Sequence, residues 1–270
     1  MRKTLILFIF IVNICVGFLS GCIDEKLSTT NENLGIAFKN IDTHFYNYDY
    51  EYSWSILMNY ATFTLSMLDG MKNYEDLIGE EITYVEDTIQ NYQNSGDSSS
   101  DIDEKINLYN SKKNTIKTSL NNMITYRYFI NMTRNKMILL ENYVSKNDLM
   151  NLKVQSEDYE EAVIYLDEMV DILIKLKNNE YNRSELGIGT YTEEIFSVYD
   201  LYQEAWSIYR QYLLTEDETE ANDLYQEYSE KYDEAYAIES NENLTEANEE
   251  VDGWYQENIA VCIDIFVGYE

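Results

Sequence analysis

The chain has 270 residues, of which 50 are acidic and 19 basic, and its formal net charge is −31. Such a charge repels nucleic acid and anionic membrane surfaces, so nucleic acid is excluded as a partner. The chain has no proline and only ten glycines, which favours long helices, and it is long enough for one large domain or two small ones.

The N-terminus has the three parts of an export signal. A positively charged start at residues 1–3 precedes the apolar residues 4–18, and a Leu-Ser-Gly-Cys run ends at Cys22. The apolar stretch of about 15 residues is shorter than the roughly 20 that span a bilayer. The run resembles the lipobox of prokaryotic lipoprotein signal peptides. The alternatives are an ordinary secretory signal or an uncleaved membrane anchor.

The resemblance implies that the Cys22 thiol is diacylglycerated and that cleavage makes Cys22 the first residue. It marks residues 1–21 as a signal peptide. The hydrophobic pattern of the rest predicts a short tether (22–30) and one helical domain (31–270). Removal of the signal leaves 17 basic and 50 acidic residues, a charge of −33. The expected location is the extracytoplasmic face of the cell membrane, where the lipid is the contact with the bilayer.

Hydrophobic spacing predicts a long helical hairpin over residues 31–145. An apolar stripe with steps of three and four runs from Leu34 to Tyr52, continues after a one-residue stutter, and resumes over 78–92. The first real break is expected at 94–101. A second helix should follow to about Ser145, with a coiled-coil line at intervals of seven. That line consists of Tyr109, Ile116, Met123, Ile130, Met137 and Val144.

Four further stripes over residues 157–270 predict three to four more helices. They span 159–173, 195–213, 221–235 and 251–266. No segment shows the sustained alternation of a strand. The predicted fold class is therefore all-α, an elongated antiparallel helical bundle with a long helical hairpin and three to four further helices.

One segment of this acidic chain is basic. Residues 105–153 hold nine basic and two acidic residues. The simplest interpretation is an inner helix flanked by carboxylates of its neighbours. The functional alternative is an anion-binding site, whose candidate residues are Lys112, Lys113, Lys117, Arg127 and Arg134.

The chemistry of known active sites is poorly represented. His44 is the single histidine, so zinc-protease and ferritin-like di-metal motifs are impossible, and no nucleophile elbow or phosphate-binding loop is present. The acidic loop at 97–104 does not match a calcium-binding EF-hand. We expect no enzyme activity, no cofactor and no metal. Cys262 is expected to be a buried, inert thiol.

The chain is rich in tyrosine, with 26 residues, and the densest run is 45–54. Tyr46, Tyr50 and Trp54 form a candidate aromatic binding face for envelope proteins or glycans, since an aromatic body gives area and its hydroxyl a hydrogen bond. The alternative is that these rings pack against other helices. The triplets at Asn131, Asn182 and Asn243 match the N-glycosylation sequon.

Together these features predict a lipid-anchored, extracytoplasmic protein with a non-enzymatic structural or partner-binding role at the cell envelope. The alternative is a ligand-binding accessory lipoprotein of a transporter or sensor, with a pocket where the basic segment meets the tyrosine-rich helices. An acidic, lysine-poor composition is compatible with an archaeal source.

Overall fold

The computed structural model describes residues 2–58, 63–241 and 244–268, and side chains within 25–58, 63–240 and 247–268. The predicted signal peptide, Cys22 and Asn243 therefore lie outside the residues whose side chains are described. Among the described residues, no helix combines the length and apolar character that a bilayer crossing requires.

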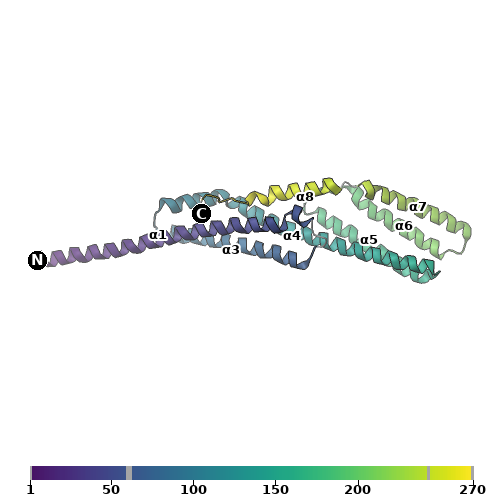
Figure 1. The fold of residues 1–270 in the computed structure, drawn as a ribbon, viewed down its shortest axis with the longest axis horizontal. Helices are drawn as coiled ribbons and strands as arrows, with labels where there is room; N and C mark the ends of the chain where they lie inside the picture. Colours follow the sequence, from purple (N-terminus) through teal and green to yellow (C-terminus); the bar gives the residue numbers. More distant parts are fainter. Residues whose placement is uncertain (1, 59–62, 242–243, 269–270) are drawn as a thin grey trace. The chain divides into compact units, whose positions relative to one another are not determined.

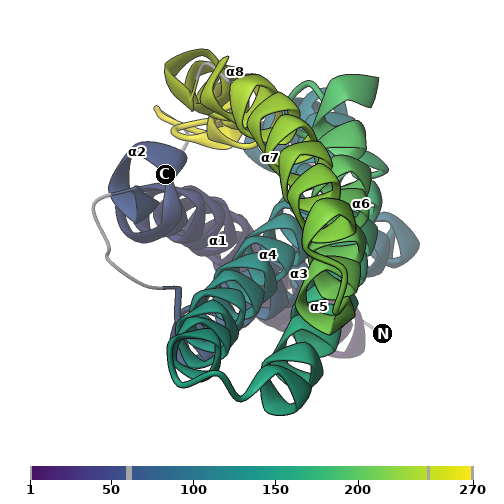
Figure 2. The same cartoon turned by 90° about the vertical axis from the view of Figure 1, so that its right-hand side faces the viewer.

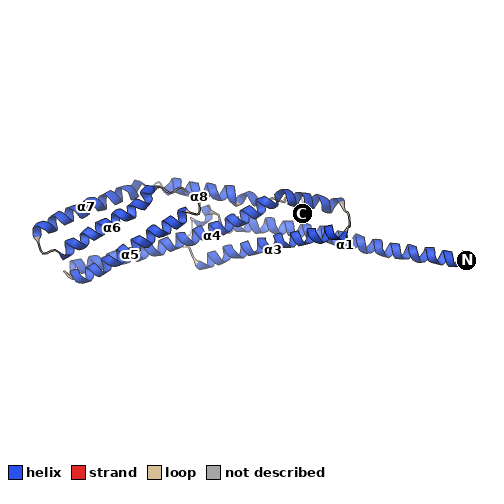
Figure 3. Cartoon of the chain, turned by 180° about the vertical axis from the view of Figure 1, so that it is seen from behind, coloured by secondary structure: helices blue, strands red, loops and turns tan. Residues whose placement is uncertain are grey.

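Helices make up nearly all of the described chain, and no strand occurs in it, which confirms the all-α prediction (Figures 1 and 3). Consecutive long helices pack antiparallel, and four helices follow the long central one, as expected. The elements are α1 (Arg2–Tyr52), α2 (Trp54–Leu57), α3 (Leu65–Ser95), α4 (Ser100–Gln155), α5 (Tyr159–Ser184), α6 (Glu193–Leu214), α7 (Glu218–Asn241), α8 (Leu244–Asn258) and a 3₁₀ turn (Ala260–Cys262).

The helices group into two compact units. Unit 1 combines the residues up to Ile56 with Asp69–Ile124 and the residues from Gln256 on, whereas unit 2 combines Leu57–Leu68 with Thr125–Tyr255. Helix α4 contributes to both. The prediction that residues 31–270 form one domain stays a prediction.

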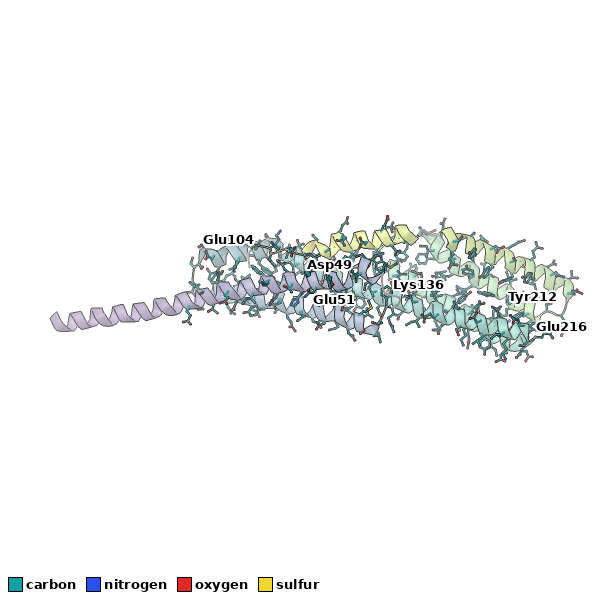
Figure 4. The ribbon with its side chains drawn as sticks, viewed as in Figure 1. Asp49, Glu51, Glu104, Lys136, Tyr212 and Glu216 are labelled. Atoms are coloured by element: carbon teal, nitrogen blue, oxygen red, sulfur yellow. The ribbon has the colours of Figure 1, made fainter. Side chains whose placement is uncertain are left out.

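Unit 1 is built from α1, α3 and the first half of α4. Tyr74 of α3 donates a hydrogen bond to Glu51 of α1 at 2.9 Å, and Asn40 donates to Glu81 at 2.8 Å, so the two helices run antiparallel (Figure 4 labels Glu51). The stripe predicted from Leu34 to Tyr52 is buried in the core as far as Tyr48, whereas Tyr52 is half-buried, and the stripe predicted over 78–92 is buried. Helical periodicity alone therefore identified the inner faces of α1 and α3.

The first break of the helical pattern lies earlier than predicted. Helix α1 ends at Tyr52, Ser53 is non-helical, and α3 begins at Leu65, so the first real break is here and not at 94–101. The one-residue stutter coincides with Ser53. Gly70 lies inside α3, where a Cβ would collide with the Tyr52 hydroxyl. The glycine thus permits a close approach of α3 to α1.

The last stripe is only partly helical. Helix α8 ends at Asn258, and the residues after the 3₁₀ turn form a strap against the core of unit 1, because Phe266 stacks on Phe38 with ring centroids 4.2 Å apart. The backbone N–H of Phe266 donates to the Asp42 carboxylate at 3.0 Å. The prediction of one helix through residue 266 is wrong. The steps of three and four residues that carry the stripe to Phe266 can be met by an irregular strap as well as by a helix.

Unit 2 contains the second half of α4 with α5, α6 and α7. Lys177 of α5 contacts Asp200 of α6 at 2.7 Å, and Asp167 of α5 contacts Arg210 of α6 at 3.1 Å. Helices α5 and α6 are therefore antiparallel. Figure 2 shows α6 and α7 side by side. These two helices are likewise antiparallel, since Tyr202 contacts Tyr232 and Tyr212 contacts Tyr225. Apolar residues of all four helices form one core.

Helix α4 is longer than predicted and does not keep one apolar line. It continues to Gln155 instead of about Ser145, and Val144, the last residue of the predicted line, is exposed. A straight α-helix drifts about 20° per heptad from a strict seven-residue repeat. Moreover, α4 changes partners, since Tyr109 contacts Phe38 and Glu86, whereas Tyr143 and Met150 belong to the core of unit 2.

Candidate functional site

Two of the three predicted anion-binding lysines of unit 1, Lys113 and Lys117, already contact a carboxylate. Lys113 and Lys117 contact Glu86 of α3 at 2.8 and 2.7 Å, and Tyr109 donates to the same carboxylate at 3.1 Å. Burial opposes the charge of Glu86, but these three hydrogen bonds outweigh it and lower the pKa of Glu86 to about 2. The site thus holds an internal anion.

Arg127 and Arg134 lie in unit 2, so the candidate set is divided between the two units. The Arg127 guanidinium lies over the ring of Tyr128 at 5.3 Å, and Arg134 donates to the side chain of Asn135 at 3.5 Å. Ten residues of helix separate Lys117 from Arg127, which corresponds to about 15 Å of rise. The sequence alone could not reveal that division.

A buried ion-pair cluster was missed at the sequence level. Glu180 of α5 is 1% exposed and pairs with both Lys136 of α4 and Arg183, whose Nη1 is 2.9 Å from Glu180 Oε2 (Lys136 is labelled in Figure 4). The Arg183 guanidinium also lies 4.8 Å from the ring centroid of Phe129 and 5.8 Å from that of Tyr191. The Glu-x-x-Arg spacing in α5 was the one available signal.

Further pairs join α4 to α5 along their length. Lys146 contacts Glu168 at 2.6 Å, and Lys153 pairs with Asp158 and Glu161. The hydrogen bonds to these two carboxylates raise the pKa of Lys153. The interpretation of a basic helix flanked by acidic neighbours accounts for these contacts. Pairing within the fold therefore compensates much of the positive charge of α4.

The candidate aromatic face is only partly exposed. Tyr46 and Tyr50 lie on the surface of α1, whereas Trp54 is 6% exposed. The helix breaks at Ser53, so Trp54 does not continue the face that Tyr46 and Tyr50 share. Two of the three residues remain available to a partner.

The densest aromatic cluster lies on α6 and α7 of unit 2. The ring centroids of Tyr209 and Tyr228 are 4.7 Å apart, and the Trp206 indole donates to the Tyr143 hydroxyl at 2.7 Å. Neighbouring ring pairs continue the cluster at centroid distances of 5.2 to 6.0 Å. We call this set the tyrosine ladder: Tyr202, Trp206, Tyr209, Tyr212, Tyr225, Tyr228 and Tyr232. Figure 4 labels Tyr212 at one end.

The tyrosine ladder predicts a loss of stability at alkaline pH. Burial raises the pKa values of Tyr202, Tyr228 and Tyr232. Outside the ladder, burial also raises the pKa of Tyr191 to about 12. The unfolded phenols ionise near pH 10, so the stabilisation is complete below pH 10 and is lost as pH rises through the folded pKa values.

We therefore expect unfolding to set in above about pH 10, with the tyrosinate absorbance rising together with the loss of helical circular dichroism. The urea-unfolded chain serves as control, because its phenols should titrate in one step near pH 10. A folded chain whose tyrosines all ionise in that same step, while its helicity persists, would contradict the burial of the ladder.

Other candidate residues are placed individually. His44 is half-buried, and burial lowers its pKa against the opposing charge of Glu81. Cys262 is buried, as predicted, and burial raises the pKa of its thiol to about 11. Asn182 is exposed in the last turn of α5, and Asn131 is half-buried within α4. In the described part of the chain, no three His, Cys, Asp or Glu side chains are grouped to hold a metal ion.

Open grooves mark the surface of each unit. In unit 1, a groove of about 460 Å³ lies between α1 and α3, and another of about 580 Å³ follows α3. In unit 2, a groove of about 610 Å³ is lined by α5, α6 and α7, including Asp200, Glu204 and Glu227. Carboxylates line all three, and neither Arg127 nor Arg134 lines any of them. These grooves fit cationic groups better than anions.

Comparison with known proteins identifies no relative of this chain, since no family model, no curated protein and no solved structure matches it.

Proposed function

We propose that this chain is a lipid-anchored extracytoplasmic protein with a non-enzymatic structural or partner-binding role at the cell envelope. The single observation that supports partner binding is the character of the described surface. Lys113, Lys117, Lys136, Lys146 and Lys153 of α4 pair with carboxylates of α3 and α5, and the surface around them is rich in carboxylates and carries exposed aromatic side chains. Such a surface favours cationic partners.

The anchor rests on the N-terminal sequence. The Leu-Ser-Gly-Cys run follows a charged start and a short apolar stretch, as a lipobox does. A diacylglyceryl group supplies two acyl chains, which is what stable anchoring requires. A strongly acidic body would otherwise be repelled from an anionic bilayer.

A ligand-binding accessory role at a transporter or sensor is the second candidate. The open grooves support it only for cationic ligands, because carboxylates line them. The anion-binding form, with Lys113, Lys117, Arg127 and Arg134, lacks that support because Lys113 and Lys117 share the carboxylate of Glu86 and neither arginine lines a groove.

Replacing Cys22 by serine tests the anchor in the source organism or a lipoprotein-processing host. The variant should lose lipid modification and accumulate as an unprocessed precursor or leave the membrane fraction, because serine offers no thiol to acylate. Fractionation and immunoblotting measure the outcome. The matched control is Cys15→Ser, which changes a cysteine within the signal and should leave processing intact. Mature-sized Cys22→Ser protein that stays in the membrane fraction would refute lipidation.

A further inference from the structure

The surface of unit 1 between α1 and α3 combines an open groove with exposed apolar side chains. Asn33, Ile36, Ala37 and Asn40 of α1 form one wall, and Glu80, Glu81 and Tyr84 of α3 form the other. Ile36 is 51% exposed and Tyr84 is 44% exposed, although both lie on helices whose other faces are buried. We call this surface the Ile36–Tyr84 groove.

Tyr84 stands between two depressions. The second groove, along α3, shares Glu80 and Tyr84 with the first and adds Gly79, Thr83 and Asp87. The phenol ring therefore forms a ridge that a partner can contact from both sides.

The α3 wall of this groove is strongly acidic, whereas the exposed Lys39 lies next to Asn40 in the sequence of the α1 wall. Helix α3 carries seven carboxylates and a single lysine, Lys72, which pairs with Asp76. Glu81 is held at the groove by the amide of Asn40 at 2.8 Å. An apolar floor with an aromatic ridge and a carboxylate rim is complementary to aliphatic side chains accompanied by ammonium or guanidinium groups.

We propose that the Ile36–Tyr84 groove binds a basic amphipathic helix of a partner protein. Apolar side chains of that helix cover Ile36, and its lysine or arginine side chains lie against the Tyr84 ring and the carboxylates of Glu80 and Glu81. In helix-in-groove recognition the bound helix presents apolar anchors at three- and four-residue spacing, and the groove between α1 and α3 offers exposed Ile36 and Tyr84 to such anchors. This inference deepens the proposed partner-binding role and rests on it.

A second copy of this chain is a poorer occupant. Its surface carries the same excess of carboxylates, so two copies would bring like charges together. A basic helix instead gains from the field of the whole acidic body, which raises its association rate at low ionic strength. Binding of this kind should weaken as salt is added.

The test uses the full chain in zwitterionic lipid nanodiscs and a synthetic amphipathic helical peptide of lysine and leucine, with empty nanodiscs as the blank. Fluorescence anisotropy of the labelled peptide reports the Kd. Ile36→Ser and Tyr84→Ser should each weaken binding about tenfold, as loss of a central anchor does. The matched control Tyr46→Ser, which removes an exposed ring of α1 outside the groove, should leave the Kd within about twofold.

Charge is tested separately. Glu80→Gln should weaken the peptide more than Glu104→Gln, an exposed carboxylate of α4 away from the groove (labelled in Figure 4). A peptide with glutamate in place of lysine should not bind. Equal affinity for all variants would show that total charge alone holds the peptide and would overturn the proposal.

Analytical sedimentation of the parent and the Ile36→Ser variant tests whether a second copy of this chain occupies the groove. The chain should be monomeric with and without Ile36→Ser, whereas a dimer that this substitution dissociates would make the groove an interface between copies and overturn the proposal. If Cys22 proves unlipidated, the same titration without nanodiscs still tests the groove, so the anchor and the groove fail independently.

Discussion

Replacing Glu180 by alanine is expected to lower the free energy of unfolding of unit 2 by about 3–5 kcal/mol, the cost of removing one partner of a buried ion pair. Glu180 is almost fully buried and pairs with both Lys136 and Arg183. Its removal leaves the Arg183 guanidinium enclosed by the rings of Phe129 and Tyr191 without a counter-charge. Urea titration followed by circular dichroism measures the loss.

Glu168→Ala is the matched control for this substitution. Glu168 also joins α5 to α4, through Lys146 at 2.6 Å, but it is largely exposed. An exposed pair contributes about 0–1 kcal/mol, so the control should lose little. If the two variants lose the same stability, the Glu180 cluster does not hold α4 and α5 together.

Replacing Trp206 by alanine is expected to destabilise unit 2 by about 3–5 kcal/mol, as for other buried tryptophans. The indole contacts the rings of Tyr209, Tyr228 and Tyr232 at centroid distances of 5.5 to 5.8 Å. Its Nε1 also donates to Tyr143. The substitution removes the centre of the tyrosine ladder and leaves a cavity between α6 and α7.

Two further variants separate the contributions of the indole ring and of its hydrogen bond to the loss of stability. Trp206→Phe keeps a ring but removes the donor to Tyr143, and it should cost about 1–3 kcal/mol. Tyr236→Ala removes an exposed ring of α7 and should stay within about 0.5 kcal/mol of the parent. A Trp206→Ala variant as stable as Tyr236→Ala would show that the ladder does not form the core of unit 2.

The sequence predicted the helices well because each one buries a stripe with helical spacing. The prediction from sequence was wrong where tertiary packing decides which residues are buried or where a helix ends. Val144 continues a seven-residue line, yet α4 turns a different face toward α5, so Val144 is exposed. Phe266 keeps the spacing of α8 but reaches the core of unit 1 from a strap. The break at Ser53 left only a one-residue stutter in the pattern.

The candidate sites depended still more on tertiary contacts. Composition identified the basic segment, but only the fold shows that Glu86 takes up Lys113 and Lys117. The sequence is densest in tyrosine at 45–54, where the candidate face was predicted, but the ring pairs of the tyrosine ladder form between α6 and α7, which requires these two helices to pack together. The exposure of Tyr84 beside Ile36 likewise required two helices to be placed side by side.

The covalent state of the mature N-terminus tests the central claim most directly. Mass spectrometry of the protein extracted from the membrane fraction should find a chain that begins at Cys22 and carries the added mass of a diacylglyceryl group on its thiol. A chain that retains residues 1–21, or that begins elsewhere with an unmodified Cys22, would contradict lipid anchoring.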